Sequence, residues 1–178
     1  LNRQLFLPFI EFLKSNLVVH NMDSGKDFRQ NCISGNQVYF TPMNPDASAG
    51  INDIWSALTG GHEELLTLYV KSRALEISRY HSGIGRFGFY DLCGQPLGPA
   101  DYLALADNLR VIVIENIPQM GRSNFNEAKR FVTLIDALYE AKTRLICSAA
   151  AEPELLYLEG EGVFEFERTA SRLREMQS

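Results

Sequence analysis

The fold is decided by the stretch RVIVIENIPQMGRSNFNEAKRFVTLIDALYEAKTRLICSA, residues 110–149. Its two ends, Arg110–Ile117 and Arg144–Ala149, are mostly apolar and have the length of buried strands. The segment between them, Glu127–Lys142, repeats apolar residues at the spacing of one helix face; these are Phe131, Leu134, Ile135 and Leu138. The stretch therefore predicts one strand–helix–strand unit of an α/β fold.

Upstream of this unit the residues follow the pattern of antiparallel strands. We expect strands at Leu66–Val70 and Ala74–Tyr80, and a third at Arg86–Leu92 after a hairpin turn around Gly83–Gly85. A short helix is expected at Pro99–Asn108. Hairpins followed by a strand–helix–strand unit predict a mixed α/β sheet.

The two ends of the chain are less regular in pattern. A buried helix is expected after Pro8, with short strands at Leu17–Met22 and Gln37–Thr41. Pro42–Gly50 holds two prolines and small polar residues, so we interpret it as a linker or mobile loop before a helix at Ile51–Leu58. The chain ends in an Arg-rich amphipathic helix, FEFERTASRLREMQS.

The composition is that of a soluble globular protein, with 46% hydrophobic and 22% charged residues. A net charge of −5 gives no basic field to recruit nucleic acid or anionic lipid, and no apolar run is long enough for a membrane span. The cysteines are far apart and odd in number, which favours a reducing compartment. The three histidines are isolated from one another, so metal chemistry has no support.

Two motifs could hold a nucleotide. Gly83–Gly88 satisfies G-x-G-x-x-G, and Glu115 follows a later strand as a ribose-binding acid would. We interpret the glycines as a hairpin turn, because we expect the strand to continue and no helix to begin before about Pro99. VIVIEN at Val111–Asn116 resembles a Walker B strand, but the chain contains no G-x-x-x-x-G-K-[ST] phosphate loop. We therefore favour an exposed Glu115 at the end of a buried strand.

Four arginines are candidates for phosphate binding, since guanidinium groups bind phosphate through two hydrogen bonds and keep their charge. Arg3 lies just ahead of the first predicted helix, and Arg130 follows Lys129 on the long helix. Arg168 and Arg172 share one face of the last helix with Glu175. Surface ion pairs are the more common role of such residues, and we favour that role for Arg168 and Arg172.

Four blocks, LNRQLFLPFI, FYDLCGQPLGPADYLALA, NEAKRFVTLIDALYEAKTRLICSA and FEFERTASRLREMQS, resemble the C-terminal half of the ZapE family of AAA+ ATPases. The resemblance implies the C-terminal part of a P-loop fold. Residues 1–41 would end the AAA+ core, and residues 42–178 would form a C-terminal α/β region with the terminal Arg-rich helix. In that family the phosphate loop, the Walker B acids and the sensor Asn precede the part that matches.

The same resemblance implies a function for the parent protein: ATP hydrolysis with Mg²⁺, coupled to work on a protein partner, which is the division protein FtsZ in bacteria. It implies a homo-oligomer in the bacterial cytoplasm or, as an alternative, the mitochondrial matrix. From the net charge and the lack of a long apolar run, we expect no nucleic-acid partner and no integral membrane segment. Arg3 would be the arginine finger and Arg130 the sensor 2 residue, with weaker nucleotide roles for Arg168 and Arg172.

Other functions remain open. The chain alone is expected neither to bind ATP tightly nor to hydrolyse it, because it lacks the phosphate loop. It could instead be a non-catalytic lid or partner-docking module. A free-standing dinucleotide-binding enzyme is the third alternative, and it depends on the G-x-G-x-x-G motif alone.

Overall fold

The computed structural model describes residues 37–177, which belong to a compact unit of residues 32–178. Arg3, the helix predicted after Pro8 and the strand predicted at Leu17–Met22 lie outside the described residues. The predicted division between residues 41 and 42 therefore stays a prediction. The elements are β1 (Tyr39–Phe40), α3 (Pro45–Thr59), β2 (Glu64–Val70), β3 (Arg73–His81), β4 (Ile84–Gly88), α4 (Phe89–Cys93), α5 (Pro99–Asn108), β5 (Val111–Ile117), η1 (Arg122–Asn124), α6 (Phe125–Glu140), β6 (Arg144–Ala149), η2 (Pro153–Leu155) and α7 (Val163–Glu175).

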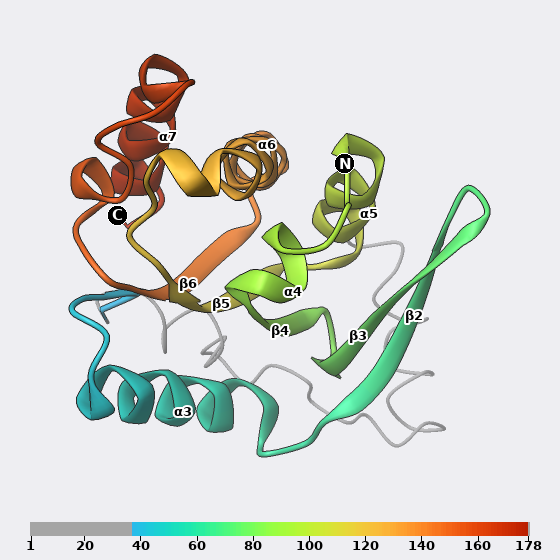
Figure 1. Ribbon diagram of the computed structural model, residues 1–178. Coiled ribbons are helices and arrows are strands. Elements are labelled where there is room, and N and C mark those ends of the chain that lie inside the picture. Colours follow the sequence, from blue (N-terminus) through green and yellow to red (C-terminus); the bar gives the residue numbers. More distant parts are fainter. Residues whose placement is uncertain (1–36, 178) are drawn as a thin grey trace, which may run out of the picture. The chain divides into compact units, whose positions relative to one another are not determined.

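These strands form one mixed sheet in the order β1-β6-β5-β4-β3-β2, shown in Figure 1. The strands β1, β6, β5 and β4 pair in parallel, whereas β3 pairs antiparallel with both β4 and β2. The helix-containing connections from β4 to β5 and from β5 to β6 permit the parallel pairing. The predicted mixed α/β sheet is confirmed, as is the strand–helix–strand unit of residues 110–149.

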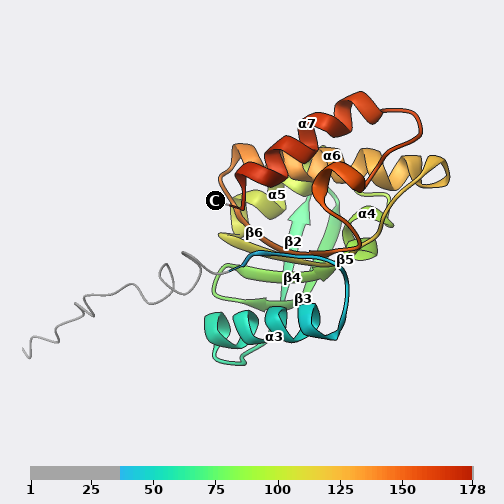
Figure 2. The same cartoon turned by 90° about the vertical axis from the view of Figure 1, so that its left-hand side faces the viewer.

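Helices cover both faces of the sheet (Figure 2). The helices α4, α5, α6 and α7 lie on one face, and α3 lies on the other. Side chains alternate along each strand, so β5 sends Ile112 and Ile114 to the first face and Val113 to the α3 face. This two-sided burial explains why the central strands are nearly continuous apolar runs.

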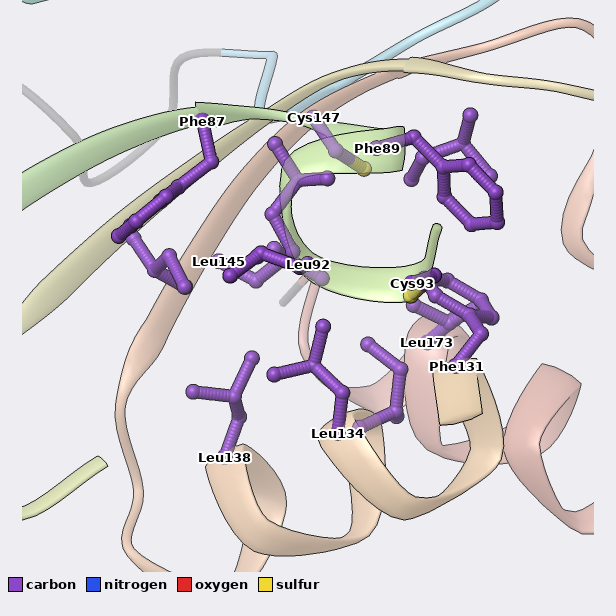
Figure 3. Close-up of a cluster of buried hydrophobic side chains, with 14 of the residues drawn as sticks. Phe87, Phe89, Leu92, Cys93, Phe131, Leu134, Leu138, Leu145, Cys147 and Leu173 are labelled. Carbon is purple, nitrogen blue, oxygen red and sulfur yellow. The ribbon is translucent and has the colours of Figure 1, made fainter. Parts of the chain in front are cut away.

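The larger core lies between the sheet and helices α4 to α7. Figure 3 shows Leu134 and Leu138 of α6 pointing toward Leu92 of α4 and Leu145 of β6, and Phe131 lies beside Cys93. These apolar side chains are almost completely buried, which is the main source of stability for such a layer. A smaller cluster under α3 consists of Val38, Ile51, Trp55, Leu58, Ile84, Val113 and Ile146.

The interpretation of Pro42–Gly50 as a linker or loop is wrong, because α3 begins at Pro45. The side chain of Asn44 accepts a hydrogen bond from the Ala47 amide at 2.8 Å and so caps the helix. Proline is tolerated in the first turn, where its missing N–H has no helical partner to lose. Gly50 allows close packing, since a Cβ there would lie 2.5 Å from the Phe40 ring.

The strand predicted at Arg86–Leu92 is also wrong in part. The strand β4 ends at Gly88, and α4 begins at Phe89, well before Pro99. The Gly88 amide donates to the Asp91 side chain at 2.7 Å, which starts the helix. The hairpin turn itself is confirmed, since Ser82 and Gly83 connect β3 to β4 with φ of 47° and 80°. Glycine adopts the positive φ of position 83 without strain.

Candidate functional site

A buried arginine in the central sheet is the most unusual polar residue in the described part of the chain. Arg86 is only 5% exposed and lies on the α3 face of β4. Its Nε and Nη2 donate to the two carboxylate oxygens of Glu115 at 2.6 and 2.7 Å, and Nη2 also donates to Asn52 Oδ1 at 2.7 Å. A two-bond pair of this kind fixes both groups in position as well as neutralising the buried charge.

Strand register brings this pair together. Arg86 lies opposite Val113 in the parallel pairing of β4 and β5, and Glu115 is two residues further along β5. Residues two apart face the same side of a sheet, so Glu115 is the diagonal neighbour of Arg86 on the α3 face. Asn52 reaches the same place from α3, one helical turn before Trp55. Glu115, which we expected to be exposed, is only 20% exposed and is ion-paired.

A second arginine enlarges this network. Arg79 of β3 lies directly opposite Arg86, an arrangement of like charges that would be unfavourable alone. Glu63 accepts hydrogen bonds from Arg79 at 2.6 and 3.0 Å, and Glu115 lies 3.9 Å from the same guanidinium. The hydrogen bond from Arg79 lowers the pKa of Glu63 below its usual value.

Trp55 completes the network from the helix side. The guanidinium carbons of Arg79 and Arg86 lie 5.6 and 5.8 Å from the centre of its ring, within the range of cation–π attraction. Two buried donors, Arg86 Nη1 and Trp55 Nε1, make no hydrogen bond of ordinary geometry within residues 37–177. Two cations, two carboxylates and one indole therefore hold α3 against the sheet, in a network whose donors are not all satisfied.

Arg130, predicted as a sensor 2 residue, lies on α6 and contacts the end of a neighbouring helix. Its Nη1 donates to the carbonyl of Cys93 at 2.9 Å. That carbonyl ends α4, where helix carbonyls lack intrahelical partners and attract cations. The adjacent Lys129 has a different neighbour, with its ammonium 5.9 Å from the centre of the Phe125 ring. The nucleotide role of Arg130 stays a prediction.

Arg168 and Arg172 lie where α7 crosses α6. Both pair with Asp136 of α6, Arg168 at 2.8 Å, and Arg172 also pairs with Glu140 at 3.1 Å. The Arg172 guanidinium carbon lies 4.8 Å from the centre of the Tyr139 ring. Tyr139 donates a hydrogen bond to Glu175, and this bond raises the pKa of the Tyr139 hydroxyl. The structure thus brings the two arginines together with acids, and their nucleotide role also stays a prediction.

Comparison with known proteins gives the family. A family model described as AFG1-like ATPase matches residues 1–178. The chain belongs to the AFG1-like ATPase family. It is 32% identical to the cell division protein ZapE of Escherichia coli K12, over all of this chain and 48% of ZapE. It is 30% identical to lactation elevated protein 1 homolog B of Danio rerio, over all of this chain and 42% of that protein.

The family resemblance seen in the sequence is thereby confirmed. This AFG1-like chain spans about half the length of ZapE. No solved structure shows a significant match to it.

The glycine motif of this AFG1-like chain differs from a dinucleotide fingerprint. A helix does begin directly after Gly88, contrary to our expectation, but Gly85 lies within β4 rather than in a loop after it. A Cβ at Gly85 would lie 2.9 Å from side-chain atoms of Leu109 and Phe87, so this glycine serves core packing. The five-residue helix already has its N-terminus capped by Asp91, and Glu115 is held by Arg86. These contacts do not favour dinucleotide binding.

Two cysteines of the AFG1-like chain lie among the described residues, and neither is placed for reaction. Cys93 and Cys147 are buried, and burial raises the pKa of both thiols, which disfavours the reactive thiolate. Between residues 37 and 177, no cluster of three or more His, Cys, Asp or Glu residues could hold a metal ion. In the same range, no helix is long and apolar enough to cross a membrane.

Proposed function

We propose that the full-length protein is an ATPase that couples hydrolysis of Mg·ATP to work on a protein partner, and that this chain is its part without the phosphate loop. The match of the AFG1-like ATPase model to residues 1–178 carries the proposal. A relative is named a cell division protein, and by analogy with it the partner is a division protein. The family resemblance suggests FtsZ. The site of action is the bacterial cytoplasm, with the mitochondrial matrix as the alternative.

The described residues do not fit a nucleotide cradle of their own. The chain has no G-x-x-x-x-G-K-[ST] sequence, whose amide groups and lysine hold the phosphates in P-loop enzymes. Arg130 is engaged by the Cys93 carbonyl, and Arg168 and Arg172 are engaged by acids of α6. ATP and Mg²⁺ would therefore be held elsewhere in the full-length protein, and this chain would contribute groups that act on that site.

The contribution that we assign to this chain is an arginine finger, Arg3. In a homo-oligomer it would reach the γ-phosphate held by a neighbouring subunit and stabilise the charge of the transition state. Such fingers contribute roughly 10³–10⁵ in rate. Lysine supplies the charge without the planar fork, so Arg3→Lys should be impaired as well.

The test uses the full-length protein. Arg3→Ala should leave ATP affinity nearly unchanged while turnover falls by about 10³ or more, since the group acts in the transition state. Mixing Arg3→Ala with a variant of the phosphate-loop lysine should restore part of the activity, because each supplies what the other lacks. Normal turnover by Arg3→Ala would refute the finger, and turnover by residues 1–178 alone would refute the proposed division of roles.

The second candidate function is a non-catalytic partner-docking module. It is favoured by an exposed aromatic side chain, Phe164, at the start of α7. Under this alternative, substitutions at Arg3 would change neither ATP affinity nor turnover, whereas substitutions at Phe164 would reduce association with a partner.

A further inference from the structure

One surface of the molecule combines exposed apolar side chains with acids. Phe164, in the first turn of α7, is 81% exposed, and Leu158 in the preceding loop is 57% exposed. The acids along the same stretch are Glu152, Glu154, Glu159, Glu161, Glu165 and Glu167, and residues 145–167 contain no Lys or Arg. We call residues 154–167 the acidic–apolar surface. Large exposed aromatic groups in a charged rim are typical of protein interfaces.

Three of these six acids form no ion pair within residues 37–177. Arg174 pairs with Glu152 and Glu154, and Arg122 lies 3.6 Å from Glu159. The carboxylates left without an ion pair among the described residues are those of Glu161, Glu165 and Glu167. The surface therefore keeps a negative charge that favours a basic partner.

The surface is also hollowed on both sides of the first turn of α7. One hollow of about 280 Å³ lies between α6 and α7 and is lined by Phe125, Val132 and Phe166, with Glu161 and Glu165 at its wall and Lys129 of α6 as its one cation. The other, of about 490 Å³, is lined by Leu158 and Val163, with Glu167 beside them. Each hollow thus offers an apolar wall beside a carboxylate, which suits a side chain or turn that is both apolar and basic.

A complementary feature lies elsewhere on the same chain, at the tip of the β2–β3 hairpin. Tyr69 is 81% exposed there, next to Lys71 and Arg73, and residues 65–75 contain no acid. Arg73 pairs with Asp101 at 2.6 Å but remains more than half exposed. Lys71 has no ion pair within the described part of the chain. This hairpin tip, residues 69–73, is therefore both basic and apolar.

The hairpin tip cannot cover the acidic–apolar surface of its own molecule. Figure 1 shows the tip extending from the sheet on the side away from α7. Both features can therefore be buried together only between copies. A contact between two different surfaces repeats head to tail, so that each copy uses its tip on one neighbour and its acidic–apolar surface on the other.

We propose that a second copy of this chain docks its β2–β3 hairpin tip on the acidic–apolar surface. Tyr69 and Phe164 supply the apolar contact, and Lys71 faces the carboxylates of Glu165 and Glu167. The inference names the surfaces of the homo-oligomer in the proposed function and rests on it for the existence of that oligomer. Opposite charges at the rim set the register and exclude a tip-to-tip arrangement, in which lysines would meet.

The test measures self-association of the full-length protein by sedimentation, without nucleotide, at two salt concentrations. Lys71→Glu should weaken association by about tenfold or more, and Glu165→Lys with Glu167→Lys should do the same. A chain that carries Lys71→Glu, Glu165→Lys and Glu167→Lys together should associate as the unchanged protein does, because the charges are exchanged across the contact. Lys142→Glu is the matched control, since Lys142 is also an exposed turn lysine with positive φ, 57° against 55° for Lys71.

Apolar variants test the other half of the contact. Tyr69→Ser and Phe164→Ser should each weaken association by about tenfold or more, whereas Leu103→Ser, at an exposed site on α5, should not. Unchanged association in these variants, or no rescue by the exchanged charges, would overturn the inference. Because no nucleotide is present, that result would leave the ATPase proposal standing. Association through these residues in a protein that never hydrolyses ATP would overturn the ATPase proposal alone.

Discussion

Glu115 lies between two arginines of the sheet, 2.6 Å from Arg86 and 3.9 Å from Arg79. The two arginines face each other across β3 and β4, so this carboxylate compensates a repulsion as well as forming a pair. The whole arrangement lies under α3, where Trp55 covers both guanidinium groups. The position of α3 on the sheet is therefore fixed by these polar contacts in addition to the apolar packing beneath it.

Removing the charge of Glu115 should be costly. Glu115→Gln leaves the buried Arg86 without its counter-ion, and breaking a buried pair in this way costs about 3–5 kcal/mol of unfolding free energy. Urea denaturation measures the loss. Glu140→Gln, at a largely exposed acid, is the control and should cost under about 1 kcal/mol.

A double variant separates the pair from the packing around it. Arg86→Met with Glu115→Leu removes both charges and should be less destabilising than Glu115→Gln, because no unpaired buried charge remains. Equal losses for Glu115→Gln and the Glu140→Gln control would contradict the role of Glu115.

Acid should lower the stability of the folded protein by protonating Glu63, which pairs with Arg79 in the same network. Its pKa is lowered in the folded protein by Arg79, so the unfolded chain binds more protons between the two pKa values. The stabilisation is fully present above the unfolded pKa, near 4.3, and is lost as pH falls through the lower folded value. Glu63→Gln should flatten this part of the stability curve, as followed by thermal melting from pH 6 to pH 2.5. An unchanged slope would show that the ion pair does not form.

Asp136 should matter for the docking of α7 rather than for nucleotide binding. The Asp136 carboxylate accepts hydrogen bonds from both Arg168 and Arg172, and the Arg172 side chain is only 17% exposed. Hydrogen bonds to charged groups contribute about 1.5–3 kcal/mol, so Arg172→Gln should lower unfolding free energy by about that amount. Arg168→Gln, at a more exposed site, should cost under about 1 kcal/mol. Weaker ATP binding by either variant in the full-length protein, without lost stability, would instead support a nucleotide role.

The sequence predicted the central unit well because its signals are local. Each strand of residues 110–149 is an apolar run, and the stripe of α6 from Phe131 to Leu138 falls on one face. The start of α3 was missed because Pro45 and the small residues after it occur in loops and in first helical turns alike. Only the hydrogen bond of the Asn44 side chain distinguishes the two cases.

The buried network could not be predicted for a different reason. Arg86 finds its partners 29 and 34 residues away, in another strand and in α3. The sequence offered only two signals. One is a single arginine, Arg86, inside an apolar strand, and the other is Glu115, two positions after Val113, the residue that pairs with Arg86. Without the parallel register of β4 and β5, nothing in the sequence relates these two residues.

Arg130 offers the sharpest distinction between a structural and a nucleotide role. Its hydrogen bond to the Cys93 carbonyl joins α6 to the end of α4. Under the structural role, Arg130→Ala should lower unfolding free energy by about 1.5–3 kcal/mol, while Arg130→Lys, which keeps a donor and the charge, should lose less. ATP affinity of the full-length protein should then be unchanged in both variants.

Under the sensor 2 role, ATP affinity should fall while the free energy of unfolding stays nearly unchanged. Both variants should bind ATP more weakly, and lysine should rescue little, because phosphate recognition uses the planar fork of the guanidinium. Melting curves and ATP titrations on the same preparations measure the two quantities side by side. Thr133→Ala is a control on α6, since its hydroxyl bonds only to the Lys129 carbonyl of its own helix. Lost affinity at unchanged stability would establish Arg130 as a nucleotide residue and exclude a purely structural one.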